Sequence, residues 1–410
     1  MDAEGAAAFS RVRVFDAFRH RDFRLLWIGQ AISLIGDAAF FTALGWRAFT
    51  VVGSSKLGIV FLAQAVGLLA TLLIGGALAD RLPRRSMMIA SDFARLAVIG
   101  TLAVFDATGN LTFGALLVLA FLAGLGDGFF FPAFGGIVPL VVEQASLPSA
   151  NSLIGVARWG AFLIGPSLAA LLYGAVGSAT VFAIDAFSFA VSAGFLALAR
   201  PRQVAPEEKT GAFREIAAGV RYVAGVPWLW VTITLFAVIL MLQLAPQQVL
   251  MPELVREHFG RGIGAYGLLT TAFGVGTVAG TLAFGQFPPR RRRGLVNYVF
   301  WLVNSIAIAL LALSPWFELA AGFAVVRGFC VGFGVAMWET MLQELVPEHM
   351  LSRVVSLDFF GSFGLMPVGL AFAAAVAGFA SAGTIIAAGA LVSATMIAIT
   401  MTRPWLRRVE

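Results

Sequence analysis

The sequence predicts an all-α membrane protein with twelve transmembrane helices in two six-helix bundles. Of its 410 residues, 60% are hydrophobic and only 12% are charged, and the mean hydropathy is +0.90. A soluble core of this size cannot hide so large an apolar fraction. Uncharged stretches of about 20 residues, the length of a helix that crosses a bilayer, recur along the chain. Motifs of the first half also recur in the second half.

The first bundle, 23–199, holds six expected spans, which are separated by charged or glycine- and proline-rich segments. They cover 23–49, 57–79, 87–105, 112–142, 153–176 and 180–199. The second bundle, 228–402, holds six more, which cover 228–250, 263–287, 295–313, 317–345, 354–378 and 384–401. Only the segment GFASAG marks the break before the last span.

Basic residues are distributed unequally between the two sides of the predicted membrane domain. With both ends and every even-to-odd connection on one side, that side carries 21 of the 28 Lys and Arg residues. The positive-inside rule therefore places both termini in the cytoplasm. The net charge of +6 is then a signal of topology, and no nucleic-acid partner is expected. Residues 1–22 lack the apolar core of a signal peptide, so the first span is the expected insertion signal.

Three cytoplasmic segments flank and join the bundles: 1–22, 200–227 and 403–410. The first alternates basic with bulky apolar residues, which suits either an interfacial helix or a disordered basic tail. The second contains GAFREIAAGVRYVAG, in which apolar residues recur at helical spacing opposite charged ones. We expect an amphipathic helix on the cytoplasmic surface there.

Three pairs of motifs indicate an internal duplication. DRLPRR at 80–85 matches QFPPRR at 286–291, an offset of 206 positions. IVPLVVEQ matches LVPEHM through Pro139 and Pro347, and GAVGSAT at Gly174 matches GFASAGT at Gly378. A six-plus-six duplication explains all three pairs, and repeated bundles are typical of transporters.

Several function classes find no support in the sequence. Cys330 is the only cysteine, so a disulfide within the chain is impossible. The histidines His20, His258 and His349 lie outside the expected spans, which argues against a metal cluster or a histidine relay. No catalytic constellation and no phosphate-binding loop is recognisable, because GLGDGFFF fits helix packing around Asp127 better. We therefore expect no enzyme, no cofactor and no direct use of ATP.

Charged residues within the spans are the functional candidates, because a charge at membrane depth is costly. Asp92, Arg95, Asp127 and Arg158 all fall about 8 to 14 Å from the cytoplasmic ends of their helices, if each residue adds about 1.5 Å. They form one predicted layer just above the loop at 80–85.

Asp37 is expected about 20 Å into the first span, near the midplane. A carboxyl group there can bind and release a proton as its access to water changes, as a proton-driven antiporter requires. The alternative is a carboxylate that is hydrogen-bonded to neighbouring helices for packing.

Glu339 is the second proton candidate, and its alternative role is to form an ion pair at an inner gate. Arg47 and Asp185, near the outer ends of their spans, are expected to form a structural ion pair.

Several motifs of the sequence resemble those of a known group of transporters. GGALADRLPRR resembles the signature between the second and third helices of the major facilitator superfamily, with Pro83 where a second glycine is usual. GVARWGAFLIGPSLAALL resembles the fifth-helix motif of drug/proton antiporters through Gly165 and Pro166, with alanines in place of its terminal glycines. GDAAFF, IDAFSFAVSA, GVRYVAGVPWL and QELVPEHMLSRVVSL are similar to the branch of enterobactin-type siderophore exporters and macrolide or multidrug efflux proteins.

The resemblance implies the major facilitator fold and a charge relay that locks the cytoplasmic side. Asp80, Arg84 and Asp127 take the positions of this relay. The predicted gate as a whole consists of Asp80, Arg81, Arg84, Arg85, Asp92, Arg95, Asp127 and Arg158. Ion pairs suit a latch because desolvation nearly cancels their attraction. Alternatively, the arginines of the loop only determine topology.

The superfamily also implies a cavity lined by the first, fourth, seventh and tenth helices. Aromatic candidates for contact with a bulky substrate are Phe40, Phe41, Phe129, Phe130, Phe236 and Trp338. Polar candidates are Gln243, Gln247, Gln248, Gln343 and, near the midplane of the tenth helix, Arg327.

Together these features predict a monomeric exporter of the bacterial inner membrane. It would move an amphipathic small molecule, such as a drug, a macrolide-like product or a siderophore, outward against inward-moving protons by alternating access. Membrane lipid and the substrate are its expected partners, and the proton gradient its energy source. An importer or lysophospholipid flippase of the same fold is the first alternative. A non-transporting receptor or scaffold is the second, against which Asp37 and the relay argue.

Overall fold

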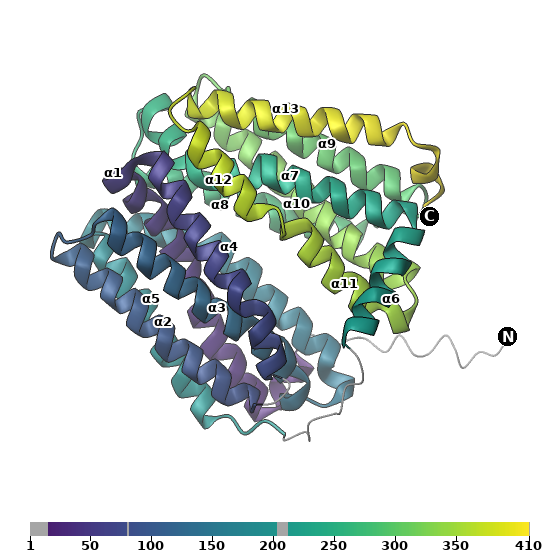
Figure 1. Ribbon diagram of the computed structural model, residues 1–410, viewed down its shortest axis with the longest axis horizontal. Coiled ribbons are helices and arrows are strands. Elements are labelled where there is room, and N and C mark those ends of the chain that lie inside the picture. Colours follow the sequence, from purple (N-terminus) through teal and green to yellow (C-terminus); the bar gives the residue numbers. More distant parts are fainter. Residues whose placement is uncertain (1–14, 80–81, 203–211, 410) are drawn as a thin grey trace. The chain divides into compact units, whose positions relative to one another are not determined.

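The computed structural model describes residues 15–79, 82–202 and 212–409. Its regular elements there are helices (Figure 1). The long helices are α1 (Arg21–Ala79), α2 (Arg84–Ala107), α3 (Phe113–Val141), α4 (Leu147–Val176), α5 (Ser178–Leu198), α6 (Ala212–Gly225), α7 (Pro227–Glu253), α8 (Ile263–Gln286), α9 (Arg293–Ala312), α10 (Phe317–Leu345), α11 (Glu348–Phe363), α12 (Met366–Val376) and α13 (Ala382–Met401). Short helical turns cover Asp16–Arg19, Gln144–Ser146, Leu254–His258 and Pro404–Arg408.

Within the described residues, 11 helical segments are long and apolar enough to cross a membrane. This confirms the all-helical, multi-pass fold. The first segment, Arg21–Leu72, has 52 residues and includes the predicted span 23–49 and most of the predicted span 57–79. Its length of about 78 Å is more than twice the roughly 30 Å of hydrocarbon.

Gly53 explains why two predicted spans fall within one helix. Its φ of 77° and ψ of 169° are not helical, so α1 consists of two helices joined at a kink. Glycine adopts a positive φ at little cost, because it has no Cβ atom. The predicted spans 23–49 and 57–79 therefore lie on either side of Gly53.

The chain forms two compact units. Unit 1 comprises Met1–Ala43, Ala63–Gly165 and Ala175–Glu207, and unit 2 comprises Leu44–Leu62, Pro166–Gly174 and Glu208–Glu410. In unit 1, α2 packs against α3 and α5; in unit 2, α10 packs against α8 and α9, and α7 packs against α12 and α13. The division of the chain into the bundles 23–199 and 228–402 stays a prediction.

Glycines allow several of these helices to touch at the backbone. A Cβ atom on Gly124 of α3 would lie 2.1 Å from the carbonyl oxygen of Gln64, and one on Gly328 of α10 would lie 2.0 Å from that of Phe273. Such contacts are typical of membrane helices, which associate through small residues in the absence of a hydrophobic driving force. They hold the side chains beside them in a rigid frame.

The helix expected between the bundles is present as α6. It packs against α11 in unit 2, where a Cβ atom on Gly219 would lie 3.1 Å from the side chains of Arg353 and Leu357. Val223 of α6 joins a buried cluster with Leu229 and Val354. Its location at the cytoplasmic surface stays a prediction.

Candidate functional site

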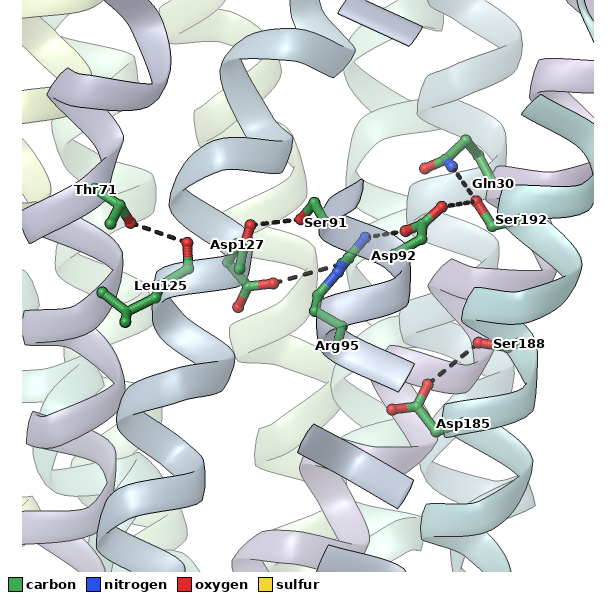
Figure 2. Close-up of polar contacts among 11 residues, drawn as sticks. Gln30, Thr71, Ser91, Asp92, Arg95, Leu125, Asp127, Asp185, Ser188 and Ser192 are labelled. Carbon is green, nitrogen blue, oxygen red and sulfur yellow. Dashed lines mark hydrogen bonds and ion pairs between the residues drawn. The ribbon is translucent and has the colours of Figure 1, made fainter. Parts of the chain in front are cut away.

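A cluster of four carboxyl groups around one guanidinium lies inside unit 1. Asp37 comes from α1, Asp92 and Arg95 from α2, Asp127 from α3 and Asp185 from α5. Arg95 interacts electrostatically with all four acids. Figure 2 shows four of these side chains and the hydroxyl groups that hold them.

Arg95 is the centre of the cluster. Its Nη2 atom lies 2.5 Å from Asp92 Oδ1, and its Nη1 atom lies 3.5 Å from Asp127 Oδ1. The guanidinium also stacks over two rings, 4.1 Å from the centroid of Phe130 and 4.3 Å from that of Phe189. Both contacts favour a buried cation, and only 4% of Arg95 is exposed.

Asp92 is held in a fixed position. Its side chain is fully buried, and its second oxygen, Oδ2, accepts a hydrogen bond of 2.7 Å from Ser192 of α5. Gln30 of α1 donates in turn to the Ser192 hydroxyl, at 2.9 Å. The Arg95–Asp92 pair is therefore a structural pair with few remaining partners to exchange.

Small residues make room for the cluster. A Cβ atom on Gly126 would lie 2.9 Å from Arg95 Cγ, so glycine at this position of α3 admits the arginine stem. Ser91, one turn before Arg95, donates a hydrogen bond of 2.7 Å to the Gly126 carbonyl. Thr71 donates to the Leu125 carbonyl at 3.0 Å, which joins α1 to α3 at the same level (Figure 2).

Among the described residues, Asp37 and Asp185 are the two acids of the cluster without an ion-pair partner. Asp185 is 1% exposed, and within the described chain only one of its oxygens, Oδ1, has a hydrogen-bond partner, Ser188 at 3.4 Å. A Cβ atom on Gly36 would lie 2.6 Å from that oxygen, so α5 touches α1 directly beside Asp37. Asp37 is partly exposed and makes no hydrogen bond or ion pair with the described residues.

The sequence predicts Asp185 in an outer ion pair with Arg47, and this prediction is wrong. Asp185 interacts electrostatically with Asp37 and Arg95, accepts a hydrogen bond from Ser188 and lies against Gly36. The position of a charge along its helix does not determine which neighbouring helix it faces.

The predicted gate loop is only partly described. Asp80 and Arg81 lie outside the described residues. Arg84 donates to the carbonyl of Gly136 in α3. Arg85 donates to the carbonyls of Leu196, at 2.8 Å, and Ala197, at 2.5 Å, at the end of α5. Both arginines thus satisfy helical carbonyl groups in this structure, and the latch stays a prediction.

Arg158 does not belong to the cluster. It occupies an exposed position of α4, next to the buried Ala157, and forms no ion pair with a described residue. Its assignment to the cytoplasmic gate stays a prediction. Gly165 of the fifth-helix motif has a packing role, since a Cβ atom there would lie 2.5 Å from that of Ala38. Pro166 lies inside α4, and its carbonyl approaches Gly267 of α8 in unit 2.

The aromatic cavity candidates of unit 1 are mostly packed. Phe40 is 4% exposed, and its ring centroid lies 5.5 Å from that of Phe182. Phe130 stacks on Arg95, and Phe129 packs against the unit 1 core. Only Phe41, at 44%, is well exposed.

The amide candidates of unit 2 differ from the prediction. Gln243 and Gln247 are 4% and 6% exposed. Gln243 donates to Ser305 of α9 at 2.8 Å, and Gln247 donates to the backbone of Gln243 at 2.9 Å. They therefore stabilise helix packing instead of lining an open cavity, because they occupy the inner face of α7. Gln248 and Gln343 are exposed.

The remaining candidates of unit 2 lie on α7 and α10. Phe236 packs edge-to-face on Trp301, with ring centroids 4.6 Å apart. Trp338 donates to Asp358 of α11 at 2.9 Å. Glu339 is exposed on α10. Sequence reasoning missed Asp358 as a candidate, although its signal was visible as an acid within the predicted span 354–378.

Comparison with known proteins identifies the group to which the chain belongs. Residues 13–409 match the family described as transmembrane secretion effector. Macrolide efflux protein A of Streptococcus pyogenes is 24% identical over 86% of this chain and 88% of its own. The multidrug efflux pump Tap of Mycolicibacterium fortuitum is 23% identical over 83% and 86%, and the enterobactin exporter EntS of Salmonella choleraesuis is 24% identical over 82% and 81%.

Solved structures support the fold. The nucleoside transporter NupG has a TM-score of 0.74 at 14% identity and covers 93% of this chain and 100% of its own. At this identity the likeness concerns the fold alone. Family and fold are those of membrane transporters and not of enzymes. The chain therefore belongs to the transmembrane secretion effectors, a family of efflux transporters within the major facilitator superfamily.

Proposed function

We propose that this protein is a monomeric exporter of the bacterial inner membrane, with both termini in the cytoplasm and α1 crossing twice. It moves an amphipathic small molecule outward while protons move inward, by alternating access. The proton gradient supplies the energy without a cofactor, and lipid and substrate are its only partners. The cluster of four acids around Arg95 carries the proposal. The names of the macrolide, multidrug and enterobactin relatives support export of a bulky amphipathic cargo.

The charge balance of the cluster favours proton binding. Four carboxylates and one guanidinium would carry a net charge of −3 at full ionisation. Uncompensated charges at membrane depth cost several kcal/mol each, about 3 kcal/mol at a helix centre. Protonation removes this cost for acids that have no close cation. Asp37 and Asp185 meet this condition, whereas Asp92 is paired with Arg95.

Asp37 is the acid best placed to exchange its proton with water. It is partly exposed, whereas Asp185 is buried. When Asp37 is ionised, it competes with Asp127 for Arg95, whose contact with Asp127 is 3.5 Å long. When Asp37 is protonated, Arg95 can bind Asp127 more strongly. Such a difference in contacts between two protonation states is what biases a conformational equilibrium.

In the internal duplication, a neutral group takes the position in the second half that corresponds to Asp37 in the first half. Asp37 and Gln243 are each the seventeenth residue of their helix, α1 and α7. They are also 206 positions apart, the same offset as DRLPRR and QFPPRR. In unit 2 the Gln243 amide binds Ser305 and Asn304. An amide does not titrate, so proton exchange belongs to unit 1 in this proposal.

Transport into inside-out vesicles tests the proposal. Radiolabelled erythromycin, a macrolide, and enterobactin, a siderophore, serve as cargo under an imposed pH gradient, acidic inside. We expect the parent to accumulate at least one of them. Asp37→Asn should abolish gradient-driven accumulation but keep exchange of labelled for unlabelled cargo, because exchange needs no net proton movement.

Asp106→Asn is the matched control. Asp106 is a buried acid of α2, eleven residues from Arg95 and about 16 Å along the helix, and it accepts a hydrogen bond from Ser178. This variant should accumulate cargo as the parent does. If Asp37→Asn also does so, Asp37 is not the proton carrier. If the parent accumulates the same amount of cargo with and without the pH gradient, the proposal of proton coupling is wrong.

A further inference from the structure

Arg327 of unit 2 is a partly exposed cation without an acidic partner among the described residues. It is the eleventh residue of α10, about 15 Å from the helix start and so near the middle of the hydrocarbon. Its Nε atom is enclosed and has no hydrogen-bond partner in the described chain. The guanidinium lies 4.4 Å from the ring centroid of Phe273 on α8. A guanidinium keeps its charge at neutral pH, so an anion bound at this depth would stabilise it.

Arg95 and Arg327 differ in their carboxylate partners. Arg95 has two aromatic rings and two carboxylates. Arg327 has one ring and, among the described residues, no carboxylate within ion-pair distance. The described residues therefore supply carboxylates to Arg95 and none to Arg327.

Arg327 lies on an interior face of α10. Arg327, Val331 and Trp338 are separated by four and seven residues, which places them on one side of the helix. Trp338 on that face contacts Trp228 of α7, with ring centroids 5.6 Å apart, and donates to Asp358 of α11. The face is thus turned toward α7 and α11. Arg327 remains partly exposed there, and its Nη atoms are neither enclosed nor hydrogen-bonded to described residues.

Backbone contacts hold the pair of Arg327 and Phe273 in place. A Cβ atom on Gly328 would lie 2.0 Å from the Phe273 carbonyl oxygen, and one on Gly276 would lie 2.1 Å from that of Val325. The two helices therefore touch on both sides of the pair. A preformed cation on a rigid frame loses little entropy when it binds a ligand.

We propose that Arg327 and Phe273 bind the anionic group of the transported molecule. The guanidinium would donate paired hydrogen bonds to a carboxylate, and the Phe273 ring would contact the apolar body of the cargo. The inference rests on the proposed export function and narrows its substrate class to amphipathic acids. The bound acid supplies the negative charge that no described residue places beside Arg327.

Binding of 1-pyrenebutyric acid and its methyl ester to the purified, detergent-solubilised protein tests this site. Quenching of tryptophan fluorescence gives both dissociation constants. The parent should bind the acid about tenfold or more tightly than the ester, as expected for a charge-assisted hydrogen bond. Arg327→Gln should remove this preference, and Arg327→Lys should retain part of it. Arg261→Gln, which removes an exposed pair with Glu318, should leave it unchanged.

Each outcome decides the proposal. Equal binding of acid and ester by the parent overturns it, and this measurement needs no variant. An unchanged preference in a folded Arg327→Gln protein also overturns it. If that variant does not fold, Arg327→Lys decides instead, and a fully retained preference in this variant overturns the paired hydrogen bonds to the carboxylate. The binding assay uses no pH gradient, so its result does not depend on proton coupling. A failure of proton coupling in vesicles therefore counts against the proposed function alone.

Discussion

At the scale of single residues, one arginine organises the chemistry of unit 1. Arg95 is the cation for Asp92 and Asp127, and it is the common electrostatic partner of Asp37 and Asp185. Its charge is stabilised by two ring faces as well as by carboxylates. Removing it would leave several buried acids without a cation. The cluster is therefore a unit whose members cannot be changed one at a time without consequence.

Arg95→Gln should lower the free energy of unfolding by about 3 to 5 kcal/mol, the usual cost of breaking a buried ion pair. The loss should shrink as the pH is lowered, because protons then neutralise the carboxylates that have lost their cation. Melting curves of the solubilised protein at several pH values measure this. Arg85→Gln loses only hydrogen bonds to carbonyl groups, so it should lower the free energy of unfolding by about 1 kcal/mol. This loss should not shrink as the pH is lowered. Equal behaviour of the two variants would contradict the cluster's role.

At the scale of elements, backbone contact between helices determines where functional side chains stand. α8 and α10 meet at Gly276, Gly280, Gly328 and Gly332, each of which has a carbonyl oxygen within 2.1 Å of its would-be Cβ atom. In unit 1, Gly36 brings α5 against α1 beside Asp37. Each contact fixes the rotation of a helix as well as its distance from its neighbour.

Gly328→Ala should therefore separate α8 from α10 and lower the melting temperature of the solubilised protein, by an equivalent of about 1 to 3 kcal/mol. Gly322 lies on the same helix with open space around its would-be Cβ atom. Gly322→Ala should stabilise α10 slightly, by about 0.5 to 1 kcal/mol, because alanine is the better helix former. A similar effect of both substitutions would show that the helices do not pack as described.

At the scale of the whole molecule, the proposed topology depends on whether α1 crosses the membrane twice. With two crossings, alkaline phosphatase fused after Gly53 or after Gly109 should be active outside the cytoplasm, and a fusion after Leu82 should be inactive. With one crossing, Leu82 would be external and Gly109 internal. Activity of the three fusions in intact bacteria therefore separates twelve crossings from eleven. The kink at Gly53 favours twelve.

The sequence by itself determined the helical, multi-pass fold, the resemblance to efflux transporters and the presence of charges at membrane depth. These are local properties, since hydropathy, spacing and motifs are read within one stretch of chain. The same reading placed Asp92, Arg95 and Asp127 in one layer, and the structure brings them together.

Only the tertiary structure decided which side chains meet. It placed Asp185 beside Gly36 in the cluster, left Arg158 outside it, and buried Gln243 against Ser305. The direction in which a side chain points depends on the rotation of its helix, and that rotation is set by packing against distant segments. Asp92 and Ser192 illustrate this: they are 100 residues apart in the chain and 2.7 Å apart in the fold.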